Sequence, residues 1–361
     1  PRPRFAAFRI VVMKRLQTLA GRFVLPCLGA SGKTAMDQPP EANLPESITK
    51  PRQPRVPPDF SPDFFFVDIN GVRPIWRLLI YLALYYLLRF LLLSIAAAAL
   101  PGADSVNPLW LQLLEECLLL VAALLPALFL AKLEGRRFGS YGLPIRGALG
   151  KHFWVGAVWG LAAITLLLVV MRGFGVFHFG QLALHGSRLL KFAAFWGAVF
   201  LIVGLYEDFL FRGYSLFTLA EATRFWPAAI LLSFAFGFIH LGNNGESWVG
   251  ALGAACIGLF FCLTLRRTGT LWFAVGMHAS WDWGESFLYS VPDSGQVAPG
   301  HLLSSSLHGS RWLTGGSVGP EGSVFVFVLI AAMWLLFDRL YPPAPAAPHE
   351  LALVTPAAHQ E

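Results

Sequence analysis

The sequence carries little charge for its length. Only 13% of its 361 residues are Asp, Glu, Lys or Arg, whereas 56% are hydrophobic. Ordinary soluble domains have about 25% charged and about 45–50% apolar residues. So few charges could not keep the surface of a soluble domain hydrated. Composition therefore excludes a soluble protein and indicates that the lipid bilayer surrounds most of the chain.

Cysteine is also scarce, and no two cysteines have metal-ligand spacing. Of the four, Cys117, Cys256 and Cys262 lie in or beside apolar runs, and Cys27 lies near the start. This pattern predicts free thiols rather than disulfides or a metal knuckle. The net charge of +6 does not predict a nucleic-acid partner, because the basic residues lie at the ends of apolar runs rather than on one amphipathic face.

Long apolar runs are abundant, and most have the length of about 18 to 25 residues that crosses a bilayer as a helix. The expected spans are 75–100, 109–132, 152–171, 189–218, 225–241, 247–265, 270–290 and 322–340. The sequence therefore predicts an all-α fold, a polytopic transmembrane helical bundle of about eight spans that occupies residues 71–341.

The two ends of the chain differ from this middle region. Residues 1–70 are basic and Pro-rich and residues 342–361 are rich in Pro and Ala, so both are expected to be largely disordered. Basic residues in the loops after the second, fourth and sixth spans predict that both termini are cytoplasmic. Arg172, Arg188 and Lys191 oppose this orientation, because they flank a loop that it places outside. We expect the protein to be integral to a bacterial cytoplasmic membrane.

Ionisable side chains inside membrane spans are costly, rare and usually functional. Those well inside the apolar runs are Arg89, Glu115, Glu116, Glu207, Asp208, Arg212, His240, His278, Asp282 and Glu285. Asp208 and Arg212 are four residues apart, so they share a helix face and can neutralise each other. Glu207 then stays free for chemistry, unless all three form a purely structural ion cluster.

Two histidines belong to similar patterns. Phe236 precedes His240 by four residues, and His278 precedes Asp282 by four. At 1.5 Å per residue, Glu207, His240 and His278 lie roughly 16, 22 and 12 Å from the same end of their spans. We therefore expect three helices to bring them to one cavity.

The other ionisable residues are expected to have lesser roles. Arg89 is expected to snorkel or to pair with Glu115 or Glu116, which are read as structural or as part of a substrate entry. Glu285 is expected to line the wet side of the helix that carries Asp282.

Three motifs follow one another on successive spans: Glu-Asp-x-x-x-Arg (Glu207, Asp208, Arg212), Phe-x-x-x-His (Phe236, His240) and His-x-x-x-Asp (His278, Asp282). In this order, with Gly213 after Arg212 and Leu241 after His240, they resemble the CPBP family of CAAX proteases and bacteriocin-processing enzymes. That family includes the type II CAAX prenyl endopeptidases and was formerly grouped with abortive-infection proteins. The resemblance covers roughly residues 190–290.

The resemblance implies an intramembrane endopeptidase that acts on a membrane-associated protein or peptide, which can be a prenylated CAAX protein. Glu207 would activate water with help from His240, while Arg212 would match the Arg of the family. His278 and Asp282 would stabilise the tetrahedral intermediate or bind a metal ion.

This sequence departs from the family at two positions. Asp208 replaces a Glu and keeps the charge on a shorter side chain. Asp282 replaces an Asn, and an ionised Asp cannot donate a hydrogen bond to an oxyanion. Asp282 must therefore be protonated, orient His278 or bind a cation.

Two chemistries and two other functions stay open at this point. His240, His278 and a carboxylate could bind Zn²⁺, but the HExxH helix of zincins is missing, so a glutamate-dependent hydrolysis is favoured. A mid-membrane proton or cation transporter would use the same residues, although no inverted repeats are evident. A non-catalytic scaffold or immunity protein would keep the fold only. The sequence indicates no oligomeric state.

Overall fold

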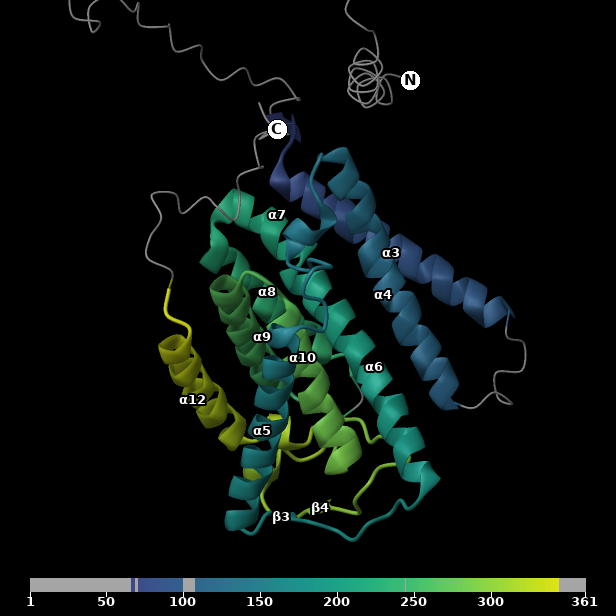
Figure 1. The fold of residues 1–361 in the computed structure, drawn as a ribbon, viewed down its shortest axis with the longest axis vertical. Coiled ribbons are helices and arrows are strands. Elements are labelled where there is room, and N and C mark those ends of the chain that lie inside the picture. The colour runs from purple at the N-terminus through teal and green to yellow at the C-terminus, as the bar shows by residue number, and fades with distance from the viewer. Residues whose placement is uncertain (1–65, 69–70, 100–107, 244, 344–361) are drawn as a thin grey trace, which may run out of the picture. The chain divides into compact units, whose positions relative to one another are not determined.

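A computed structural model describes residues 66–343 apart from 69–70, 100–107 and 244. The main helices are α3 (Pro74–Ala99), α4 (Pro108–Leu133), α5 (Lys151–Gly173), α6 (Ser187–Arg212), α7 (Tyr214–Thr223), α8 (Phe225–His240), α9 (Trp248–Thr268), α10 (Trp272–Asp282) and α12 (Val324–Leu340) (Figure 1). The predicted all-α polytopic bundle is confirmed. The predicted disordered ends, and Cys27, lie almost entirely outside the described residues.

Every predicted span contains a helix, but the number long enough to cross a bilayer is smaller. Among the described residues, five helices are long and apolar enough: Pro74–Ala99, Leu109–Leu133, Lys151–Gly173, Ser187–Thr223 and Trp248–Thr268. Helices α8, α10 and α12 have 16, 11 and 17 residues, fewer than the roughly 20 that a span needs. Among the described residues, five of the eight predicted spans therefore have the full length of a bilayer crossing, and the other three contain shorter helices.

The predicted span 189–218 is interrupted at Gly213. Helix α6 ends at Arg212, Gly213 donates its N–H to the Phe209 carbonyl (2.9 Å), and α7 begins at Tyr214. A Cβ on Gly213 would collide with the backbone oxygen and the ring of Phe209. Glycine therefore permits the break, which places Glu207 near the end of α6 and not eleven residues from it as the uninterrupted span required.

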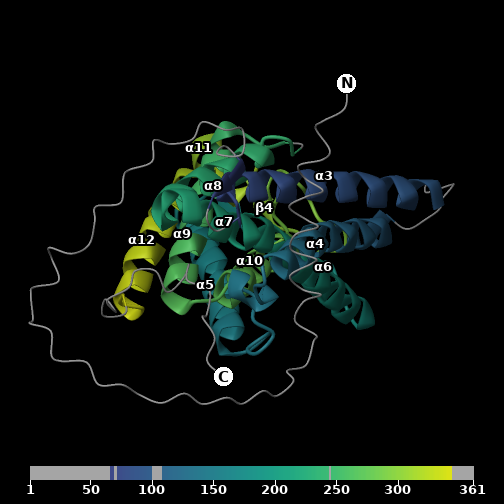
Figure 2. The ribbon, with the colours of Figure 1, turned by 90° about the horizontal axis from the view of Figure 1, so that it is seen from above.

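Helix α10 is the central helix of the described bundle. It packs against α5, α6 and α9, and in both views it lies between α12 on one side and α3 and α4 on the other (Figure 1, Figure 2). Three glycines permit its close approach to α5: a Cβ on Gly156 or Gly160 would strike the carbonyl oxygens of Phe273 or Met277, and a Cβ on Gly276 would strike that of Phe153. Small residues commonly bring membrane helices together in this way.

Short elements complete the connections. Helix α10 continues into the π-helical turn η4 (Trp283–Leu288), followed by β4 (Ser306–Leu307), α11 (Arg311–Thr314) and η5 (Pro320–Gly322). Strand β4 pairs antiparallel with β3 (Phe177–His178), and β1 (Val67–Asp68) with β2 (Gly71–Val72). The turn η3 (Phe138–Tyr141) follows α4. The β3–β4 pair fastens the loop after α5 to the loop after η4.

A charged cluster joins α3, α7 and the end of α4. Arg77 lies 3.0 Å from Glu134 (Nη1 to Oε2) and also pairs with Glu221, which pairs in turn with Arg136. Two tyrosine hydroxyls donate to Glu134, those of Tyr141 (2.6 Å) and Tyr214 (2.5 Å). Two arginines and two glutamates thus neutralise one another where these helices meet.

We expect Gly160→Val to lower the stability of the folded state by about 1–3 kcal/mol, because the added side chain must push α5 from α10. The measurement is the midpoint of thermal unfolding of the purified chain in detergent. Gly173→Ala is the matched control, since a Cβ at Gly173, on the same helix, meets nothing within 4 Å. Equal midpoints for Gly160→Val and wild type would contradict the close approach of the two helices.

Candidate active site

A cavity of about 280 Å³ lies within the bundle. Its walls come from α4, α6, α8, α9 and α10 and from the segments around η4 and η5. Four of the six predicted site residues line it: Glu207, His240, His278 and Asp282. Apolar side chains form much of the remaining wall, among them Trp196, Phe200, Val203, Phe236 and Phe261. The site is thus a polar group inside a largely apolar chamber.

The other two predicted residues, Asp208 and Arg212, support the wall from behind. Their ion pair measures 2.9 Å from Nη1 to Oδ1, and their side chains are 0% and 1% exposed. The guanidinium carbon lies 4.1 Å from the centre of the Phe236 ring, in a cation–π contact. Gly258 gives it room, because a Cβ there would strike Nη2 of Arg212.

His278 is the centre of the polar group. Its Nε2 lies 3.8 Å from Oε2 of Glu207 and 3.6 Å from Oδ2 of Asp282, while its Nδ1 lies 3.6 Å from Oδ2 of Asp208. These distances exceed those of hydrogen bonds, so the contacts are electrostatic. The free Asp208 oxygen and His278 Nδ1 are both buried without a hydrogen-bond partner.

His240 lies at the last position of α8, apart from this group. Its Nδ1 is 2.7 Å from the carbonyl oxygen of Phe236, and the two rings are 4.5 Å apart. Since a carbonyl only accepts, this contact assigns the proton to Nδ1 and leaves Nε2 as an acceptor. The ring centres of Phe236 and His278 are also 6.4 Å apart, so Phe236 lies beside both histidines.

The predicted zinc ligands do not assemble into a metal site in this geometry. Among the described residues, one group of three donors has all its ligand atoms within 4.8 Å of one another, and it consists of Glu285, Asp293 and Glu321. His240 and His278 do not form such a group with any described carboxylate. The arrangement therefore does not fit a resident Zn²⁺ ion held by His240 and His278.

Polar residues for which no catalytic role was expected also line the cavity. Glu116 of α4 lines it together with Gln112, whereas the adjacent Glu115 is exposed on the other side. The rarity of acids in a membrane span was the signal for Glu116. Asp293 and Glu321 line the cavity from loops, where acids are common, and no sequence signal distinguished them.

Two carboxyl groups in loops, those of Asp293 and Glu246, have raised pKa values and so resist ionisation. Burial, together with the neighbouring carboxylates of Asp282 and Glu321, raises the pKa of Asp293 well above its usual range. Burial also raises the pKa of Glu246, in the loop between α8 and α9. Both acids favour a proton or a cation beside them.

Residues 187–284 match the family model described as type II CAAX prenyl endopeptidase Rce1-like. The match lies within about a quarter of the chain and supports the resemblance to the CPBP family of membrane proteases. The match begins with α6, ends in η4 and includes all six predicted site residues, so the resemblance read from the motifs is confirmed. No curated protein and no solved structure was found to match the chain.

We expect Arg212→Leu to destabilise the protein by about 3–5 kcal/mol, because it leaves the Asp208 charge buried and unpaired. Adding Asp208→Asn should recover much of this loss. Thermal unfolding of the two single variants and the double variant measures the coupling. Asp338→Asn is the control, since the Asp338 side chain, paired with Arg267, is 49% exposed and should contribute less than about 1 kcal/mol. Additive effects at Asp208 and Arg212 would contradict the pairing.

Proposed function

We propose that this protein is an intramembrane endopeptidase that hydrolyses peptide bonds of membrane-associated proteins or peptides. The observation that carries the proposal is the placement of Glu207 and His278, 3.8 Å apart, in the wall of one cavity within the helices. The family match supports protease activity at the coarser level. The mechanism and the substrate class are our inference.

Glu207 is the proposed base. Its side chain is 17% exposed, so it can reach water, and a carboxylate so placed can take a proton and later return it. Water attacks the scissile carbonyl carbon as its proton passes to Glu207. Collapse of the tetrahedral intermediate breaks the C–N bond, and the proton on Glu207 moves to the leaving amine. The products are a carboxylate and an amine.

The neighbouring residues orient this chemistry. His240 offers its Nε2 as a second acceptor for the attacking water, because Nδ1 is held by Phe236. His278 presents ring nitrogens toward the carboxylates, and a ring N–H can donate to the oxyanion. Asp282, 3.6 Å from His278 Nε2, orients that ring, and this is the role we assign to it among the three that the sequence left open. Oδ2 of Asp208 lies 3.6 Å from the other ring nitrogen of His278, Nδ1.

The walls suit an apolar segment that enters from the bilayer. Aromatic residues such as Trp196 and Phe200 border the cavity, next to the acids Glu207 and Glu116. An apolar wall binds lipid-like or transmembrane residues, and the acids face the peptide that follows. A prenylated CAAX peptide, the substrate named in the family description, is therefore one member of the panel to be assayed.

The first test compares cleavage of membrane-anchored peptides, in liposomes, by wild type and by Glu207→Gln. We expect a loss of about 10²–10⁴-fold in kcat/KM, since the amide cannot act as a base. Glu115→Gln is the matched control, because it makes the same change on an exposed side chain. Equal cleavage by wild type and Glu207→Gln would overturn the proposal, as would no cleavage of any peptide.

Isotope flux into liposomes that Glu207→Gln abolishes would instead support transport. Retained activity with a zinc chelator would support the glutamate-dependent mechanism.

A second prediction concerns Glu116. Because Glu116 lines the cavity from α4 and is not among the groups that contact His278, Glu116→Gln should raise KM several-fold and leave kcat within about twofold. Glu115→Gln should change neither constant. Steady-state kinetics on the best peptide of the panel measures both. A large fall in kcat for Glu116→Gln would instead place this acid among the reacting groups.

A further inference from the structure

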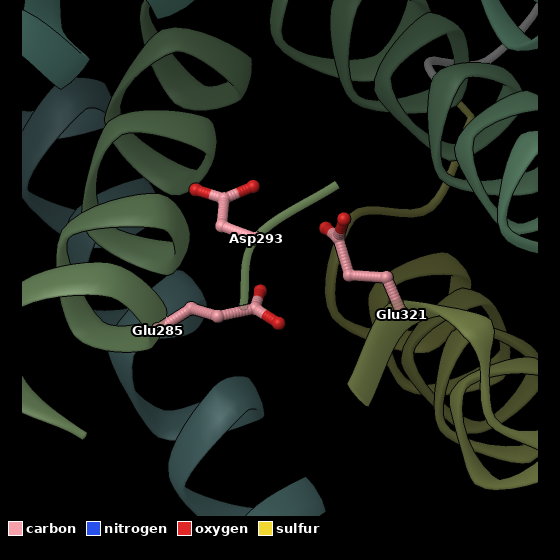
Figure 3. A group of neighbouring side chains, drawn as sticks. All are labelled: Glu285, Asp293 and Glu321. Carbon is pink, nitrogen blue, oxygen red and sulfur yellow. The ribbon is translucent and has the colours of Figure 1, made fainter. Parts of the chain in front are cut away.

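Three carboxylates meet beside the cavity, outside the matched domain. Glu285 comes from the π-helical turn η4, Asp293 from the turn that follows it, and Glu321 from η5. One oxygen from each lies within 4.8 Å of the other two, and Figure 3 shows Glu285 and Glu321 on either side of the segment that carries Asp293. Asp293 and Glu321 line the cavity wall, and Glu285 lies behind it.

Glu285 is the unusual member. It was expected to line the wet side of its helix, but the structure buries it completely, at 0% exposure. The π-helical turn turns its side chain inward. Both of its carboxylate oxygens are buried without a hydrogen-bond partner. A buried carboxylate without any partner costs several kcal/mol, so Glu285 needs either a proton or a cation beside it.

The protein itself does not supply that charge. In the described part of the chain, no Lys, Arg or His forms an ion pair with Glu285, Asp293 or Glu321. Three acids thus face one another with no basic residue between them.

Hydrogen bonds from neighbouring groups hold two of the acids in place. Ser286 Oγ donates to Oδ2 of Asp293 (3.0 Å), which leaves the other oxygen of Asp293 free. Glu321 accepts from the Trp281 indole N–H (3.0 Å) and from the backbone N–H and hydroxyl of Ser294 (3.2 and 2.9 Å). Carboxylates that bind metals are commonly fixed by such outer hydrogen bonds.

We propose that Glu285, Asp293 and Glu321 form a binding site for a divalent cation, with Ca²⁺ as the ion that fits best. All donors are carboxylate oxygens, which suit hard cations rather than zinc or copper. Ca²⁺ binds oxygens at about 2.3–2.6 Å, so its ligands can be up to about 5 Å apart, whereas Mg²⁺ demands a tighter octahedron. Backbone carbonyls and water would complete the shell.

The cation would join Glu285 and Asp293, eight residues apart, to Glu321, which is distant from both in sequence. Glu285 continues the helix of His278 and Asp282, Asp293 belongs to the cavity rim, and Glu321 precedes α12. Gly295 N–H already donates to Val318 O (3.0 Å) across the same junction. An ion here would fix the end of α10 to the start of α12 and so hold the wall that carries Asp282. This role is separate from peptide hydrolysis and does not rest on the proposed function.

The test is thermal unfolding of the purified full chain in detergent, with EGTA or with increasing Ca²⁺. We expect Ca²⁺ to raise the unfolding midpoint by several degrees in wild type, since a ligand that binds only the folded state stabilises it. Glu285→Gln and Glu321→Gln should each raise the Ca²⁺ concentration needed at least tenfold. Asp338→Asn, an acid outside the cluster, should respond as wild type does.

A second readout reports on binding itself. Tb³⁺ in the site would lie near Trp281, whose indole N–H bonds Glu321, so tryptophan excitation should yield Tb³⁺ emission that Ca²⁺ displaces. Glu285→Gln should abolish this emission. If the wild-type midpoint ignores Ca²⁺ and Glu285→Gln is as stable or more stable, the cluster holds protons and the proposal is wrong. If Glu285→Gln does not fold, Glu321→Gln decides the question: it should weaken the Tb³⁺ emission, whereas Asp338→Asn should keep it, and equal emission from both would overturn the proposal.

Discussion

Asp208 and Arg212 lie one helical turn apart inside the bundle, and neither side chain reaches water. Each charge would be prohibitively costly there without the other. The pair in turn positions the site: Asp208 faces Nδ1 of His278, and the guanidinium packs on Phe236, whose carbonyl oxygen contacts His240 and whose ring lies beside both histidines. One ion pair therefore links α6, α8 and α10. Both histidines depend on this pair for their positions, although the pair itself does not touch the reacting water in the proposed mechanism.

Much of this arrangement could be predicted from the sequence because its causes are local. Apolar run length predicted the position of every main helix except α7, and the spacing of Asp208 and Arg212 predicted their contact. The family motifs predicted Glu207, His278 and Asp282 as site residues, and these three line the cavity. The break at Gly213 was missed because the apolar run continues through it, and hydropathy does not report where a side chain would collide with Phe209. Likewise, the 11 residues of α10 form a helix too short to span, and they are stable because α5, α6 and α9 surround them.

Residues brought together by loops could not be predicted. Asp293 and Glu321 lie in segments with ordinary loop composition, and their meeting with Glu285 depends on the path from η4 to η5. Periodicity also misplaced Glu285, because a regular α-helix would turn it toward Asp282, one turn earlier, whereas the π-helical turn rotates it into the interior. Glu115 and Glu116 look equivalent in sequence, yet only Glu116 borders the cavity, since the answer depends on which face of α4 packs on α6.

The shortness of α8 has a consequence for water supply. Its 16 residues extend about 24 Å, less than the roughly 30 Å of a hydrocarbon core. This hydrophobic mismatch is relieved when the bilayer thins locally or when the adjoining polar loop sinks below the headgroups. Either adjustment brings hydrated surface to His240 at the end of the helix. A truncated helix can thus deliver the second reactant of hydrolysis to a site walled by lipid-facing helices, without a permanent pore.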